Sequence, residues 1–149
     1  MSYFVFGRMS RLESPPSFGP TRFDVREVKR GETSVVAEML AEQLGSSGGE
    51  FDFLVVSSRG ENTSDTLVSP YALDDWEVSV SLTVRELQEW SLGMLRLAGT
   101  ESQLHLFATE GYENAFKEIR CPVQQFASTF LATVIPENDI PSLHVVVTW

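Results

Sequence analysis

Apolar and polar residues alternate in several short stretches of the chain, and this alternation predicts β-strands. Residues 51–57 are almost continuously apolar instead, which is typical of a central strand covered on both faces. Stretches rich in glycine, proline and polar residues separate these segments, and Gly7 is expected to close the first of them. The strands predicted in this way are residues 3–6, 22–29, 51–57, 76–82, 103–109 and 142–149.

The clearest alternation, at residues 76–82, leads directly into a helix signal. Thr83 and Glu86 have the spacing of a capping box, in which each side chain accepts a hydrogen bond from a free backbone N–H of the first helical turn. Apolar residues at helical spacing continue from Val84 up to Gly99, which is expected to end the helix. The segment therefore predicts a strand that passes into a helix at Thr83.

Helical spacing of apolar residues also predicts three other helices. Thr33 is the expected N-cap of the first, and Gly45 stands where a left-handed residue ends a helix. The predicted helices are residues 34–44, 83–98, 112–119 and the segment from Pro122 up to Pro136.

Strand pairs that resemble hairpins alternate with helices along the chain, and this order favours an α+β fold. We expect a mostly antiparallel sheet of about five to six strands packed with three to four helices. The length of 149 residues is that of a single domain spanning residues 1–149. The expected core residues are Phe53, Val55, Val78, Val80, Leu87, Leu104, Leu106, Phe126, Phe130, Val145 and Val147.

The distribution of charge says more about possible partners than the overall composition does. The formal net charge is -10, with a net of +3 on residues 1–31 and of -13 on residues 32–149. Such a field governs association and solubility and not the fold, and it disfavours nucleic acid and anionic membranes as partners. It favours a basic protein partner. No apolar run approaches the length of a membrane span.

No motif in the sequence specifies a reaction. Cys121 with His105 or His144 could in principle form a nucleophile and base, but the sequence around the cysteine is more typical of a small half-buried residue at a helix start. The two histidines have no metal-ligand spacing, and residues 61–65 lack the acidic spacing and the glycine of a calcium loop. We therefore expect no catalytic residue, no cofactor and no metal site.

The single cysteine excludes an internal disulfide, and the first residues lack the features of a signal peptide. These observations predict a cytoplasmic protein. In general character, over its whole length, the chain resembles the immunity proteins of bacterial toxin competition systems, which are short, acidic, intracellular and poor in motifs. This resemblance implies that the protein binds and neutralises a cognate toxin domain. The alternatives are a small enzyme whose active site has no recognisable motif and a phage-type or secretion-type assembly subunit.

The expected partner-binding surface is where acidic and aromatic residues coincide near loops. Two stretches meet this condition, one at the entry to the predicted strand 76–82 and one where strand 103–109 passes into the predicted helix 112–119. The predicted partner-binding residues are Tyr71, Asp74, Asp75, Trp76, Glu77, Glu110, Tyr112, Glu113 and Glu118.

Overall fold

A six-stranded sheet with the order β2-β3-β1-β4-β6-β5 organises the molecule. The computed structural model describes residues 4–9, 23–29, 31, 33–45, 51–57, 76–99, 101–109, 116–134 and 142–149. All neighbouring strands are antiparallel except β5 and β6, which run parallel. The strands are β1 (Phe4–Met9), β2 (Phe23–Glu27), β3 (Phe51–Ser57), β4 (Leu104–Thr109), β5 (Lys117–Pro122) and β6 (Leu143–Thr148).

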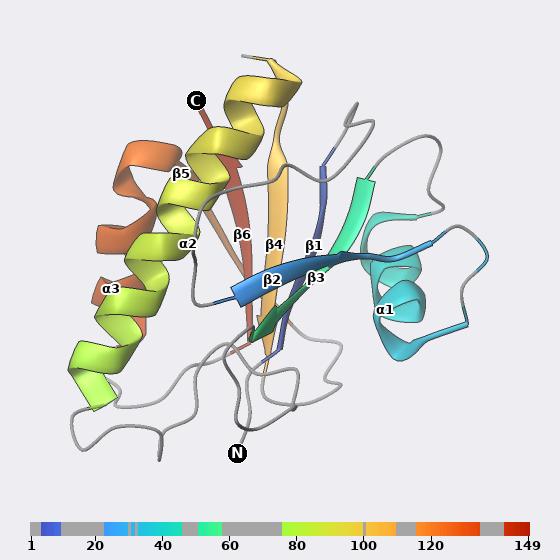
Figure 1. Cartoon of the computed structure of the whole chain (residues 1–149), viewed down its shortest axis with the longest axis horizontal. Helices are drawn as coiled ribbons and strands as arrows, with labels where there is room; N and C mark the ends of the chain where they lie inside the picture. Colours follow the sequence, from blue (N-terminus) through green and yellow to red (C-terminus); the bar gives the residue numbers. More distant parts are fainter. Residues whose placement is uncertain are drawn as a thin grey trace.

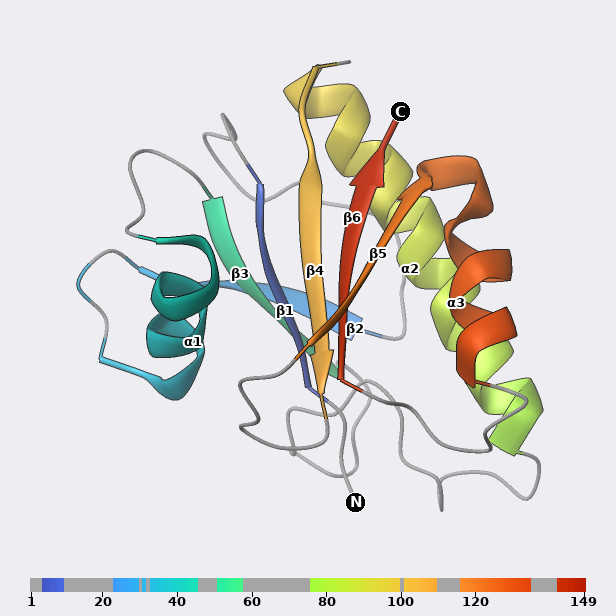
Figure 2. The same ribbon diagram turned by 180° about the vertical axis from the view of Figure 1, so that it is seen from behind.

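Three α-helices cover the sheet, and the α+β prediction is confirmed. Figure 1 and the view from behind in Figure 2 show α2 (Trp76–Ala98) and α3 (Phe126–Val134) on one face and α1 (Val35–Leu44) on the other. The parallel pair β5 and β6 needs a crossover connection, and α3 lies within it after a short 3-10 turn at Val123–Gln125.

Each face of the sheet has its own core. The larger core joins α2 and α3 to the sheet, and the smaller one joins α1 to β1, β3 and β4. Eight of the predicted core residues are buried in the larger core, while the side chains of Val55, Val78 and Val80 lie outside what the structure describes. The eight are Phe53, Leu87, Leu104, Leu106, Phe126, Phe130, Val145 and Val147.

The strand predicted at residues 76–82 is wrong, because α2 begins at Trp76 and continues unbroken to Ala98. Thr83 is accordingly a buried residue inside the helix and not its N-cap. A seven-residue alternation has β propensity, but a long apolar stripe packed on the sheet outweighs so weak a preference. Gly99 ends the helix with a φ of 103°, as expected. No helix in the described part of the chain is long and apolar enough to cross a membrane.

The helix predicted at residues 112–119 is also wrong where the structure describes it. Lys117–Pro122 is strand β5, and residues 112–115 lie outside the described residues. Ile119 and Cys121 contact the core beneath α2 and α3, while Glu118 and Arg120, which alternate with them, are exposed. The phenylalanine and alanine that precede the strand obscure this alternation of core-facing and exposed residues in the sequence. The helix predicted from Pro122 is α3, which begins at Phe126 after the 3-10 turn.

Helix α1 has a side-chain cap at its N-terminus and a left-handed glycine at its C-terminus. The Ser34 hydroxyl accepts a hydrogen bond from the backbone N–H of Ala37 at 3.1 Å, so Ser34 is the N-cap and the assignment to Thr33 was one residue early. Gly45 ends the helix with a φ of 83°, as predicted.

Gly7 lies within β1 and does not close it, contrary to expectation. A Cβ at this position would overlap the carbonyl oxygen of His105 on β4 and press on the ring of Phe53. The glycine is therefore required for the close approach of neighbouring groups and not for a turn.

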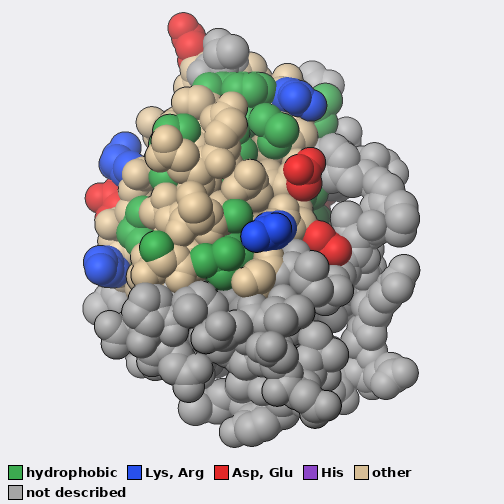
Figure 3. Space-filling view, turned by 90° about the vertical axis from the view of Figure 1, so that its left-hand side faces the viewer, with side chains coloured by type: hydrophobic (Ala, Val, Ile, Leu, Met, Phe, Trp, Pro, Cys, Tyr) green, Lys and Arg blue, Asp and Glu red, His purple; other side chains and the backbone are tan. Residues whose placement is uncertain are grey.

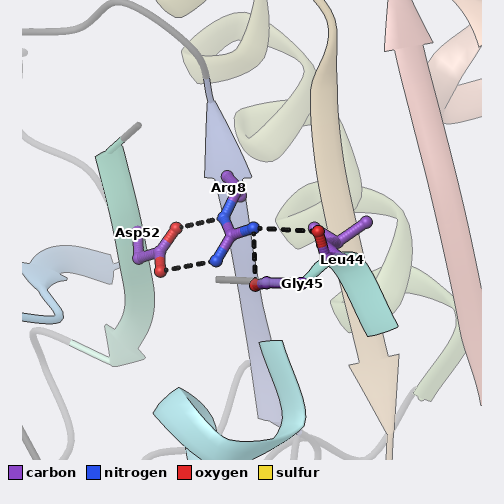
Figure 4. Close-up of polar contacts among 4 residues, drawn as sticks. All are labelled: Arg8, Leu44, Gly45 and Asp52. Atoms are coloured by element: carbon purple, nitrogen blue, oxygen red, sulfur yellow. Dashed lines mark hydrogen bonds and ion pairs between the residues drawn. The ribbon is translucent and has the colours of Figure 1, made fainter. Parts of the chain in front are cut away.

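A buried ion pair ties β1, β3 and α1 together (Figure 4). The Nε and Nη2 atoms of Arg8 donate to the two carboxylate oxygens of Asp52 at 2.6 and 3.1 Å. The Nη1 atom of the same guanidinium donates to the carbonyl oxygens of Leu44 and Gly45 at 3.4 and 3.1 Å. Arg8 thus neutralises Asp52 and also satisfies carbonyl groups at the C-terminus of α1, where a cation is favoured.

Candidate functional site

The topology brings the described residues that flank both predicted acidic stretches to one end of the sheet. Strands β3 and β4 flank β1 and run opposite to it, so Ser57 and Thr109 both end near Phe4. Strands β5 and β6 begin at that same end, where Lys117 is the register partner of Leu143. This end of the sheet is the lower end in Figure 1.

The two outer helices reach the same end. Helix α2 leads into β4 through Gly99 and Ser102, and its 23 residues extend about 34 Å away from that connection. Its first residue, Trp76, therefore lies toward the end of the sheet at which β4 stops (Figure 1). Helix α3 also ends there, as the view in Figure 2 shows. The chain thus enters and leaves residues 58–75, 110–115 and 135–141 at one end of the molecule.

These three segments carry most of the net charge. They contain eight acidic residues and one basic residue, Arg59, which is a net of -7 out of -10. The acidic residues are Glu61, Asp65, Asp74, Asp75, Glu110, Glu113, Glu137 and Asp139. The described residues that flank these segments converge at one end of the sheet, although the segments extend from residue 58 to residue 141 in the sequence.

The predicted partner-binding residues divide into three groups in the structure. Trp76 and Glu77 form the first turn of α2, and not the entry to a strand. Glu118 lies on β5, is exposed, and pairs with Arg120 at 3.1 Å. The remaining predicted residues lie outside the described residues, and these are Tyr71, Asp74, Asp75, Glu110, Tyr112 and Glu113.

A contact that the sequence analysis missed joins the two histidines. Nδ1 of His105 on β4 and Nε2 of His144 on β6 lie 2.9 Å apart, so one ring donates a hydrogen bond to the other. The ring of His144 also stacks on Phe107, with centroids 4.2 Å apart and planes at 12°. On this face α1 packs against β1, β3 and Phe107 of β4, and both histidines are half-buried. Spacing along the chain gave no signal, because the two residues are 39 positions apart.

Both imidazoles are neutral at pH 7. Burial, and then the positive charge of a protonated His105, lower the pKa of His144 from 6.5 to about 4. Burial also lowers the pKa of His105, with smaller contributions from Arg120 and Arg8. The pair therefore adds no positive charge that would offset the acidic segments.

The structure separates Cys121 from the histidines. The thiol is buried in the core beneath α2 and α3, whereas His105 and His144 lie on the opposite face of the sheet. Burial raises the pKa of the Cys121 thiol, which keeps it protonated and unreactive. The thiol–imidazole pair considered from the sequence is therefore not assembled.

Among the described residues, no group of three or more histidine, cysteine, aspartate or glutamate side chains could hold a metal ion. Residues 61–65 lie outside that part of the chain. No protein-family model, no curated protein and no solved structure matches this chain.

Proposed function

We propose that this protein is an acidic binding protein that neutralises a basic partner protein, and that the partner is a bacterial toxin domain, as for an immunity protein. The observation that carries the proposal is the convergence at one end of the sheet of the described residues that flank three segments with a combined net charge of -7. The expected place of action is the cytoplasm, where the buried free thiol of Cys121 stays reduced.

The distribution of charge along the chain supports this proposal. Acidic residues that share one end of a small protein produce a directed field, and such a field accelerates the encounter with a basic partner. At the opposite end of the sheet, the last turn of α2 carries Arg96 and the connection from α2 to β4 carries Glu101, two charges of opposite sign. The aromatic residues Tyr71, Trp76 and Tyr112, interspersed with the acids, are side chains that commonly anchor an interface once the partners have met.

The first experiment identifies a partner and asks whether it is basic. The full-length chain is used to capture proteins from the native host, and the captured protein is then expressed with and without this chain to measure cell growth. We expect a basic protein whose toxicity is suppressed by co-expression. Growth inhibition that co-expression leaves unchanged would contradict the proposed neutralising role.

The second experiment tests the charge argument with a matched control. Asp75→Lys combined with Glu113→Lys should slow association with the purified partner by about tenfold at low salt, with little effect at high salt. Glu101→Lys combined with Glu89→Lys is the control, because both residues are exposed and the pair changes the net charge by the same amount. Association that is indifferent to salt and to both reversals would remove the electrostatic basis of the proposal.

A further inference from the structure

Strand β5 forms one edge of the sheet in the part of the chain that the structure describes. It is the last strand in the sheet order and pairs with β6 alone among the described strands. The backbone N–H of Lys117 donates to the carbonyl of Ser142 at 3.0 Å, so Lys117 and every second residue after it direct their backbone groups toward β6. The backbone N–H and C=O groups of Glu118 and Arg120 therefore point outward, away from the sheet.

We propose that this edge is the interface for a second copy of the chain, paired antiparallel about a two-fold axis at Ile119. With this register, Glu118 lies opposite Arg120 of the second copy, and Arg120 lies opposite Glu118. In an antiparallel pair, two opposed residues with inward-facing backbone groups exchange both of their N–H···O=C bonds. The outward backbone groups of these two residues are therefore the ones that the symmetric pairing satisfies.

The charges on the edge also select this register. Charged side chains ordinarily hinder edge-to-edge pairing, because most arrangements place them against apolar or like-charged neighbours. Two-fold symmetry about Ile119 instead places the carboxylate of Glu118 in each copy opposite the guanidinium of Arg120 in the other. Each copy therefore contributes the same surface to the interface. In the single chain Glu118 and Arg120 form an exposed pair, at 50% and 62% side-chain exposure, so both remain available to a second strand.

The surroundings of the edge have the chemistry of an interface core. Residues 121–136 contain no charged residue, although 21% of the whole chain is charged. Helix α3 lies in this segment and contacts β5, and its Leu131 packs, partly buried, against the same core as Ile119. Figure 3 shows the side that carries α2 and α3, where hydrophobic and uncharged groups lie between groups of charged side chains. Depletion of charge is what distinguishes the centre of an interface from other surface.

Charge reversal tests the proposal, and the oligomeric state is measured by sedimentation over a range of concentrations. The natural chain should form a dimer. Glu118→Arg and Arg120→Glu, each alone, place like charges opposite each other twice, so each should raise the dimer dissociation constant by about tenfold or more. An equimolar mixture of the two variants should dimerise again, because every opposed pair is then of opposite charge.

Two controls separate this interface from a general effect of charge. Lys29→Glu and Glu89→Arg change the net charge by the same amounts at exposed positions outside β5, and neither should alter dimerisation. Hydrogen exchange at the backbone amides of Glu118 and Arg120 should slow as the protein concentration rises, since those amides become bonded. A natural chain that stays monomeric, or a dimer unaffected by either reversal, would overturn the proposal. The test of partner binding uses Asp75 and Glu113, so the two proposals fail independently.

Discussion

The guanidinium of Arg8 donates to both carboxylate oxygens of Asp52, 44 residues away, and both side chains are at most 10% exposed. Breaking a buried ion pair from one side leaves an uncompensated charge, which is the costly case. We expect Asp52→Ala to lower the free energy of unfolding by about 3–5 kcal/mol. The double variant Arg8→Met with Asp52→Leu should recover a large part of that loss, although it still lacks the bonds from Arg8 to α1. Urea denaturation measures the free energy of unfolding of both variants. A double variant that is destabilised as much as Asp52→Ala, or more, would contradict this account of the pair.

The histidine pair predicts a loss of stability as the pH falls. The pKa of His144 is lowered from 6.5 to about 4, so between these values the unfolded chain binds a proton that the folded chain does not. The contribution of His144 to the free energy of unfolding is therefore complete above pH 6.5 and declines toward pH 4. Because His144 is half-exposed, solvent screening limits the effect to about 1 kcal/mol. Urea titrations at pH 7.5 and 5 give the free energy of unfolding at each pH. The decline between the two should be smaller for His144→Gln than for the natural chain. Equal declines would refute the lowered pKa of His144.

Gly7 and Gly45 are expected to tolerate alanine to different degrees. A Cβ at Gly7 has no room beside the His105 carbonyl, so Gly7→Ala should force β1 and β4 apart and cost about 3 kcal/mol or more. Gly45 has open space around it and a φ of 83°, so Gly45→Ala should cost only the conformational penalty of about 1 kcal/mol. Thermal unfolding of the two variants gives the comparison. A melting temperature of Gly7→Ala equal to or above that of Gly45→Ala would show that β1 and β4 can separate at little cost in free energy.

The core position of α2 is tested by two leucines ten residues apart on that helix. Leu87 is 1% exposed and Leu97 is 62% exposed. Truncation of Leu87 to alanine should cost about 2–5 kcal/mol through lost burial and the cavity left behind, whereas Leu97→Ala should change stability by less than about 0.5 kcal/mol. Denaturant midpoints distinguish them, and similar midpoints would mean that the helix face is assigned wrongly.

The sequence predicted those parts of the fold in which one local preference dominates. The apolar run of β3 and the caps Gly45 and Gly99 are of this kind, since each depends on a few neighbouring residues. At residues 76–82 and 117–122 the local pattern and the tertiary environment disagree, and packing on the sheet decides between helix and strand. Strand β5 in particular depends on β6, which lies more than twenty residues further along the chain.

The candidate surfaces were predictable to different degrees. The acidic stretches can be read from composition, but their convergence at one end depends on the strand order, which no local pattern contains. The same holds for the contact between His105 and His144, because it exists only once β4 and β6 are neighbours. The sequence analysis missed the edge position of β5, because it predicted a helix there.

The position of β6 between β4 and β5 has a consequence for the order of folding. Strands β1 to β4 can associate as soon as they are made, but β5 and α3 have no place in the sheet until β6 has paired with β4. During that interval the backbone groups of β4 on this side remain open to other chains. We therefore expect the pairing of β6 with β4 to set the rate at which this protein reaches its native state.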